Sequence, residues 1–356
     1  MRILYLGDEA PQTTSRHRAD ALRRLGHSVI IEDPYAALGA ALRGRIRGAL
    51  HYRSGYRLLQ PASQRWVESL LREHAGWPDV VWVNGGELIG FKAADKLKRF
   101  DAPMVLYNND DPTGPRDGRR FDSLLAALPV YDLCVVLREP NVQEFSDHGA
   151  RLVHRVWMSY DEVHHTPFDT VDSIPPEFRS DVAFVGTWMR GEGRDDFMLG
   201  LIKRGIDVAI WGDRWHKAPN WRRLQPYWRG PALGGRDYVA AIQGAKITLG
   251  LLSKGNRDLH TTRSVEIPYA GGLLCAQRTD EHLSMYREGE EAVFWSDVDE
   301  CAAICQALLA DSKRRERIRQ AGMARVRAAG YGNEAVCRQI LERLTLSDAM
   351  HATAVR

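Results

Sequence analysis

The same local pattern opens both halves of this chain. A short apolar run ends at a glycine and is followed by a segment long enough for a helix. In the first half the run is Arg2–Leu6 before Gly7, and in the second half it is 181–185 before Gly186. A strand, a tight turn and a helix in this order begin a parallel sheet that carries helices on its faces. The recurrence therefore predicts two Rossmann-like α/β domains.

Further apolar runs extend the pattern in each half. In the first half, five runs separated by helix-length sequence complete a six-stranded sheet: 28–32, 79–83, 103–107, 131–137 and 152–157. In the second half, four runs follow 181–185: 207–211, 247–251, 272–276 and 292–295. Helical periodicity and stop signals predict helices at 16–25, 196–204, 236–243, 262–269, 298–309, 312–328 and 333–344.

The length of 356 residues supports two domains, because a single core stops growing at roughly 250–300 residues. The polar segment 166–180 contains Pro175 and Pro176 and has no helical period, which is typical of a linker. We therefore expect an amino-terminal domain over 1–165, a linker over 166–180 and a carboxyl-terminal domain over 181–332. The last segment, 333–356, should be a helix that packs back on the first domain.

Composition excludes several classes of protein. The net charge of +3 gives no basis for nucleic-acid binding, and no apolar run approaches the length of a membrane span. The apolar run before Gly7 is too short for a signal peptide. The five cysteines are scattered and odd in number, so we interpret them as small buried side chains and expect a cytoplasmic location.

The densest group of polar side chains lies between two predicted strands. Arg263 and Glu266 are three residues apart at a helix start, so they share one face. Arg263 offers a fork of donors to a diphosphate, and Glu266 can accept hydrogen bonds from two ribose hydroxyls. The alternative is an intrahelical ion pair before a glycine stop at Gly271. The position after a buried strand favours a ligand site.

The segment from His260 to Leu274, HTTRSVEIPYAGGLL, resembles the R-x-F-E-A-x-A-C-G segment of CgeB-like glycosyltransferases, which are related to a spore-maturation protein. The resemblance is strong over about 181–330, including 238–249 and 286–297, and looser in the first half, at 108–112. The chain departs from the pattern at Val265, which replaces an aromatic residue, and at Gly271, which replaces a cysteine. It also has Gly-Tyr-Gly at 330–332 where His-Thr-Tyr is usual, so no role is assigned to that loop.

The resemblance implies the GT-B fold, in which two Rossmann-like domains face a cleft. It implies transfer of a sugar from a nucleoside diphosphate sugar, without a cofactor or bound metal, to an acceptor hydroxyl on a glycan, lipid, protein or small molecule. The amino-terminal domain should hold the acceptor and the carboxyl-terminal domain the donor. The predicted donor-binding residues are Gly186, Arg190, Trp215, His260, Arg263 and Glu266.

Three aspartates are candidates for the chemistry. Asp258 precedes Glu266 by eight residues, an acid-x7-acid spacing similar to that of sugar-retaining GT-B families, although a glutamate is usual at the first position. Capping of a helix is an equal alternative for Asp258. Asp110 and Asp111 follow a predicted strand and could deprotonate an acceptor, or could belong to a proline-terminated turn. The spacing favours retention. Four more residues that follow strands are predicted on the acceptor side: Asp8, Glu9, Gly86 and Glu87.

Other motifs carry weaker hypotheses. Asp297 and Asp299 imitate the Asp-x-Asp metal motif, but capping of a helix is the expected role, so no metal site is predicted. From Ala36 to Val67 there are six arginines and no acidic residue. One hypothesis is that this segment contacts the inner face of an anionic membrane. The alternative, which we favour, is a solvated helix. The arginines proposed for that contact are Arg43, Arg45 and Arg47.

Two rival functions of the same fold remain. One is a sugar-nucleotide epimerase, or a phosphorylase, and the other is a non-catalytic paralogue that binds a nucleotide sugar. An NAD-dependent enzyme is disfavoured because neither half opens with G-x-G-x-x-G.

Overall fold

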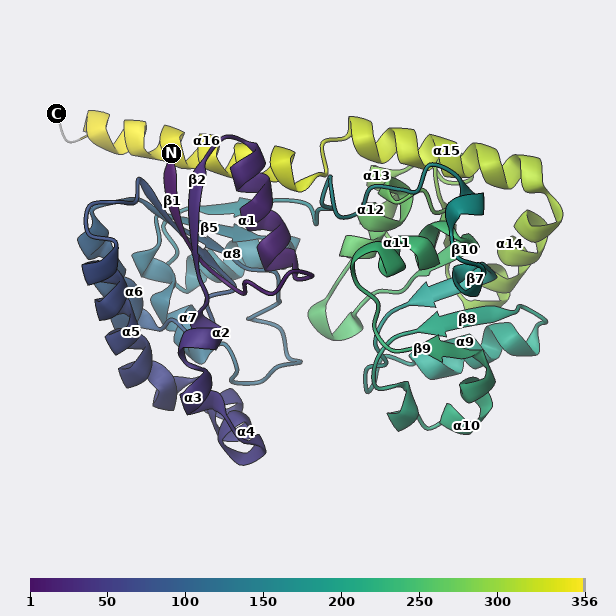
Figure 1. Cartoon of the computed structure of the whole chain (residues 1–356), viewed down its shortest axis with the longest axis horizontal. Helices are drawn as coiled ribbons and strands as arrows, with labels where there is room; N and C mark the ends of the chain where they lie inside the picture. Colours follow the sequence, from purple (N-terminus) through teal and green to yellow (C-terminus); the bar gives the residue numbers. More distant parts are fainter. Residues whose placement is uncertain (355–356) are drawn as a thin grey trace. The chain divides into compact units, whose positions relative to one another are not determined.

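A computed structural model describes residues 1–354, with side chains described except at residue 45 and at 347–354 (Figure 1). The chain forms two compact units. Unit 1 contains Met1–Trp157, the short segment Gly255–Arg257 and the chain from Asn333 onward, and unit 2 contains Met158–Lys254 and Asp258–Gly332. The first unit ends at Trp157 and not at residue 165. The backbone N–H of Met158 donates a hydrogen bond to His260 Nε2 at 3.0 Å, which ties this segment to unit 2.

The sheet of unit 1 has six parallel strands in the order β2-β1-β3-β4-β5-β6. The strands are β1 (Arg2–Leu6), β2 (Ser28–Glu32), β3 (Val80–Asn84), β4 (Met104–Tyr107), β5 (Leu133–Val136) and β6 (Val153–Arg155). Each strand begins within two residues of the start of a predicted apolar run. In the sheet, Trp82 of β3 stacks between Tyr5 of β1 and Tyr107 of β4, with ring centroids 6.3 and 6.2 Å apart. These buried aromatic side chains form part of the unit 1 core.

Helices cover the sheet of unit 1. They are α1 (Thr14–Arg24), α2 (Pro34–Ala37), α3 (Gly39–Leu42), α4 (Arg45–Arg53), α5 (Gln60–Glu73), α6 (Phe91–Leu97), α7 (Asp122–Ala127), α8 (Glu139–Asp147) and α16 (Asn333–Ala354), with 3-10 turns η1 (Arg57–Leu59), η2 (Lys98–Phe100) and η3 (Leu128–Val130). The last helix, α16, lies beside α1, as Figure 1 shows in yellow and purple. Arg24 of α1 and Glu334 of α16 form an ion pair at 2.6 Å.

The sheet of unit 2 also has six parallel strands, in the order β12-β11-β10-β7-β8-β9. They are β7 (Ser180–Val185), β8 (Val208–Trp211), β9 (Trp228–Gly230), β10 (Ala245–Gly250), β11 (Leu274–Gln277) and β12 (Val293–Trp295). The sequence pattern did not predict β9. It is a three-residue edge strand whose Trp228 and Arg229 are exposed, so it lacks the continuous apolar run of a buried parallel strand.

The helices of unit 2 are α9 (Arg194–Lys203), α10 (Trp221–Leu224), α11 (Gly235–Gln243), α12 (Thr262–Tyr269), α13 (Asp280–Met285), α14 (Val298–Ala310) and α15 (Ser312–Ala328). Its 3-10 turns are η4 (Val171–Ser173), η5 (Pro176–Phe178), η6 (Trp215–Lys217) and η7 (Gln225–Tyr227), and η8 (Lys254–Asn256) begins in this unit. No helix among the described residues combines the length and the apolar character that crossing a bilayer requires.

Each sheet contains one point at which the strand order reverses. In unit 2 the chain proceeds from β7 outward through β8 and β9, and then returns to place β10 on the other side of β7. In unit 1 the corresponding reversal lies between β1 and β3. Ligands of open parallel sheets bind beyond the carboxyl ends of the strands at such switch points. The loops after β7 and β10, and after β1 and β3, are therefore the first places to search for function.

Candidate functional site

Two arginines lie at the switch point of unit 2. Arg263, near the start of α12, donates through Nε to the carbonyl oxygen of Val185, the last residue of β7, at 2.7 Å. Arg194, the first residue of α9, donates to the carbonyl oxygens of Thr187 and Leu252 at 2.7 and 3.2 Å. Each guanidinium is thus anchored to backbone beyond β7 or β10.

The two guanidinium groups are electrostatically unfavourable neighbours. The pKa of Arg194 is lowered to about 10, first by burial and then by the positive charge of Arg263. Among the described residues, neither arginine has a carboxylate within 4.0 Å, although the charges of Glu192 and Asp258 partly offset the shift for Arg194. Concentrated positive charge beside helix N-termini is suited to binding an anion. Sequence analysis singled out Arg263 but missed Arg194, which lies two residues before the predicted helix 196–204 and carries no motif.

A hydrogen-bond network fixes the N-terminus of α12. The Thr261 N–H donates to Ser264 Oγ at 3.0 Å, and Ser264 Oγ lies 2.7 Å from His282 Nε2. The other ring nitrogen of His282 lies 2.6 Å from the carbonyl oxygen of Gln277, which can only accept, so Nδ1 carries the proton. Burial lowers the pKa of His282 to about 4, so the ring is neutral near pH 7 and Nε2 accepts the hydrogen bond of the Ser264 hydroxyl. This network positions the helix start that carries Arg263.

Glu266 lies one turn further along α12 and is buried. Its Oε2 accepts a hydrogen bond from the Tyr238 hydroxyl at 2.5 Å, and its Oε1 lies 3.8 Å from His165 Nε2. The backbone N–H of Asp161 donates to His165 Nδ1 at 2.9 Å, so a neutral His165 carries its proton on Nε2, toward Glu266. The carboxylate is thus oriented by its neighbours and keeps lone pairs for another donor.

His260, predicted to bind the donor, has both ring nitrogens occupied within unit 2. Nε2 accepts from the Met158 N–H, so Nδ1 carries the proton and donates to Glu281 Oε2 at 2.5 Å. His260 is fully buried and holds two segments of unit 2 together. We correct its role from a direct ligand of the donor to a residue that supports the loop before α12.

Asp258, on the same loop, is buried as well, and its charge raises the pKa of Arg194 against the larger effect of burial.

Trp215 packs against the turn that follows β7, where Gly186 lies. The indole N–H of Trp215 donates to the Gly186 carbonyl oxygen at 2.9 Å, and Trp215 is fully buried against Phe184. The prediction that Trp215 stacks on a ligand is therefore wrong, because neither ring face is accessible. A Cβ on Gly212 would lie 2.0 Å from Gly186 O, so this turn is packed closely.

Arg190, which was also predicted to bind the donor, is exposed and has no partner among the described residues.

In unit 1, Asp111 lies in an ion-pair cluster with Arg257, which belongs to the inserted segment Gly255–Arg257. Arg257 donates to both carboxylate oxygens of Asp111 at 2.6 Å and also to Glu144 at 2.7 and 2.8 Å. Asn141 donates a further hydrogen bond to Asp111 at 2.8 Å. The Arg257 guanidinium lowers the pKa of Glu144 to about 2. The side chain of Asp111 is fully buried, so its predicted role as a base is corrected to a structural one.

Asp110 differs from its neighbour. Its side chain is about one-third exposed, and its oxygens lie 3.8 Å from Arg116 and 3.7 Å from Arg120. Arg120 also donates to both oxygens of Glu87, at 2.9 and 3.0 Å. Burial raises the pKa of Glu87 against the opposing effect of Arg120. Asp110 and Glu87 thus belong to one charged cluster in the loops after β4 and β3. Asp110 is the accessible carboxylate of this cluster.

The other predicted acceptor-side residues follow β1 and β3. Asp8 accepts from the Ala10 N–H at 2.8 Å, and Glu9 lies 3.5 Å from Arg16. A Cβ on Gly86 would meet the core side chains Leu106 and Leu124 at 2.7 and 2.8 Å. Gly86 therefore permits close packing of the core on the side where a Cβ would lie.

The acidic pair that imitates a metal motif has other partners. Asp297 is the N-cap of α14 and accepts from the Glu300 N–H at 2.9 Å, which confirms the predicted cap. Asp299 forms an ion pair with Arg204 at 2.6 Å.

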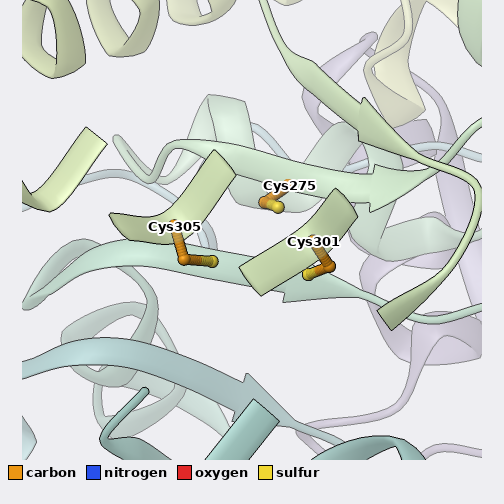
Figure 2. Close-up of side chains that lie close together, drawn as sticks. All are labelled: Cys275, Cys301 and Cys305. Carbon is orange, nitrogen blue, oxygen red and sulfur yellow. The ribbon is translucent and has the colours of Figure 1, made fainter. Parts of the chain in front are cut away.

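Three cysteines lie together in the core of unit 2 (Figure 2). Cys275 of β11 and Cys301 and Cys305 of α14 have sulfur atoms within 4.8 Å of one another, and all three are fully buried. The neighbouring thiols Cys301 and Cys305, together with burial, raise the pKa of Cys275. A raised pKa keeps that thiol neutral, and the three belong to the apolar cluster with Ile247, Leu249 and Leu308. We interpret them as packing residues, because a structural zinc site has four ligands and no fourth Cys, His or carboxylate among the described residues joins this group.

Comparisons with known proteins found one family model and several similar structures. A family model described as glycosyl transferase-like matches residues 194–342. Sucrose-phosphate synthase from Thermosynechococcus elongatus superposes with a TM-score of 0.69 at 14% identity, covering 99% of this chain and 100% of that chain. Anabaena HepE in complex with UDP-glucose gives 0.68 at 12% identity, covering 97% and 99%. The α,α-trehalose 6-phosphate synthase from Burkholderia multivorans gives 0.63 at 12% identity, covering 100% and 98%. No curated protein matches the chain significantly.

The two six-stranded parallel sheets and these similarities confirm the predicted GT-B fold. The family match over residues 194–342, together with this fold, supports a glycosyltransferase.

Proposed function

We propose that this chain transfers a sugar from a nucleoside diphosphate sugar to an acceptor hydroxyl. The observation that carries the proposal is the pair Arg194 and Arg263 at the switch point of unit 2, which have no carboxylate within 4.0 Å among the described residues. A diphosphate is the anion whose oxygens match guanidinium forks. Negative charge grows on the leaving diphosphate during transfer, so the same groups would stabilise the transition state.

Glu266 is proposed to bind the ribose. Its carboxylate is buried and oriented by Tyr238, and its lone pairs can accept from two ribose hydroxyls. The solved complexes of HepE with UDP and with UDP-glucose support a donor of this chemical class.

Asp110 is proposed as the base if the reaction inverts the sugar. It would take the proton of the acceptor hydroxyl while the hydroxyl oxygen bonds to the anomeric carbon and the bond to the diphosphate breaks. If the configuration is retained, as the Asp258–Glu266 spacing favours, no such base is required and Asp258 is the more important carboxylate. Proton NMR of fresh product identifies the anomer and so distinguishes the two courses.

Three further assignments belong to this proposal. The reaction needs no metal ion, because arginines and helix N-termini meet the diphosphate charge. The chain belongs to the CgeB-like subfamily, on the strength of the segment His260 to Leu274. The protein acts in the cytoplasm, where its five free cysteines stay reduced.

A ligand screen tests the proposal. A ligand that binds only the native state raises the melting temperature. We expect one of the UDP, GDP or dTDP sugars to do so and to be turned over when an acceptor is present. Stabilisation without turnover against any acceptor class would instead support the non-catalytic paralogue, and conversion of the donor sugar without an acceptor would support the epimerase. No stabilisation by any nucleotide sugar would contradict the proposal.

A further inference from the structure

Helix α4 in unit 1 exposes large apolar side chains on one side. Ile46 is 86% exposed and Leu50 is 54% exposed, and a spacing of four residues places them on the same face. Leu58, on the adjacent turn η1, is 59% exposed. Figure 1 shows α4 at one end of unit 1, beyond α3. With Arg43, Arg47 and Arg53, these three residues form what we call the α4 surface.

The α4 surface is strongly basic. Arg43, Arg47 and Arg53 are exposed, and none of the three has a carboxylate within 4.0 Å among the described residues. The side chain of Arg45, which was predicted to take part, lies outside the described residues. Arg57 pairs with Asp122 at 3.0 Å and so contributes little net charge. No acidic residue occurs between Asp33 and Glu68, so nothing within this segment neutralises the arginines.

A hydrogen bond that the Tyr52 hydroxyl donates to Asp117 at 2.7 Å ties α4 to unit 1, but the helix buries little of its own surface. None of the side chains described at 46–53 is buried. Its N-cap is Gly44, with φ 101°, which provides no side-chain cap. A nine-residue helix with no buried side chain among those described and no side-chain cap is marginal in water, so a surface that covers its apolar face would stabilise it.

From this combination we propose that the α4 surface docks the protein reversibly on an anionic lipid bilayer. The arginines are attracted to negatively charged headgroups, and Ile46 and Leu50 enter the boundary of the acyl chains. An acidic protein or a nucleic acid would engage the arginines but would leave the isoleucine and leucine in water. The apolar pair therefore favours a bilayer.

Sedimentation with lipid vesicles tests the proposal. The full chain should bind vesicles that contain phosphatidylglycerol in phosphatidylcholine at least about tenfold more tightly than vesicles of phosphatidylcholine alone. Binding should weaken as salt shortens the range of electrostatic attraction. The double variant Ile46→Ser, Leu50→Ser should bind the anionic vesicles about tenfold more weakly, as should Arg43→Gln, Arg47→Gln, Arg53→Gln.

Matched controls lie in unit 2. Val171→Ser removes an exposed apolar side chain, and Arg222→Gln, Arg223→Gln remove exposed charge, so none of them should change vesicle binding. Nucleotide-sugar binding should be unchanged in the α4 variants, which separates this proposal from the proposed function. Equal binding to both kinds of vesicle would overturn the proposal. The proposal would also be overturned if the Ile46→Ser, Leu50→Ser variant still bound vesicles and heparin as the unmodified protein does. That result would indicate a general polyanion site.

Discussion

Arg257 donates to both carboxylate oxygens of Asp111, at 2.6 Å each, from a three-residue segment that lies between two stretches of unit 2 in the sequence. This contact separates the roles of two adjacent aspartates. Asp111 is buried and paired, whereas Asp110 is partly exposed.

The contact predicts a large loss of stability when Arg257 is replaced. Arg257→Gln would leave the buried Asp111 carboxylate without its cation, which costs about 3 kcal/mol of unfolding free energy. The double variant Arg257→Gln, Asp111→Asn should be more stable than Arg257→Gln alone, because the unpaired charge is gone. Urea unfolding measures both. A loss below about 1 kcal/mol for Arg257→Gln, typical of a surface pair, would contradict the assignment.

If the reaction inverts the sugar, Asp110 should matter for catalysis and not for stability. Asp110→Asn should lower kcat by about 10²–10⁴-fold if Asp110 is the general base, with donor affinity unchanged. Asp95→Asn, which changes an exposed aspartate of α6, is the control. If Asp110→Asn is fully active and the product keeps the anomeric configuration of the donor, the reaction follows the retaining mechanism.

The stability of the protein should depend on pH through His282. Its folded-state pKa is lowered to about 4, chiefly by burial, while the unfolded value is about 6.5. Between these values only the unfolded chain binds the proton. The contribution of His282 to the free energy of unfolding is therefore complete above pH 6.5. It falls by up to about 1.4 kcal/mol per pH unit as the pH drops toward 4.

The test is the slope of unfolding free energy against pH between 5 and 6.5. Glu144 and Glu300, whose pKa values are lowered to about 2, lose their contributions mainly below this window. The slope should be shallower in His282→Gln than in the unmodified protein. Identical slopes would show that His282 is not held neutral by the network at Ser264 and Gln277.

Much of the fold was predictable because buried parallel strands leave a plain signal. Runs such as Arg2–Leu6 are apolar and end at a glycine, and the structure has β1 at the same bounds. The edge strand β9 was not predictable, since Trp228 and Arg229 face solvent and break the apolar pattern. Helix α13 likewise has only six residues, too few to show a period.

The site was harder to predict, because residue type and position after a strand do not determine which way a side chain points. Trp215 and Gly86 have the residue types of ligand contacts, yet both face the core. Asp110 and Asp111 are adjacent in sequence, and only tertiary contact with Arg257 distinguishes them. Arg194 had no motif, and its importance follows from burial beside Arg263.

Transfer is predicted to survive removal of divalent metal. Asp297 caps α14 and Asp299 pairs with Arg204, so both carboxylates already have partners in unit 2. Turnover measured in excess EDTA should equal turnover without it, and Asp299→Asn should behave the same way. Loss of activity that Mn²⁺ or Mg²⁺ restores would assign a metal role to this pair after all.

The central claim is that Arg194 and Arg263 bind the diphosphate of a nucleotide donor. Isothermal calorimetry with the free nucleoside diphosphate tests it most directly, because no acceptor is needed. Arg263→Ala should weaken binding by about 1.5–3 kcal/mol, the range for a hydrogen bond to a charged group, with Arg263→Lys intermediate. Arg222→Ala, which changes an exposed arginine of α10, should bind as the unmodified protein does. Equal affinity in Arg263→Ala and Arg222→Ala would contradict the account.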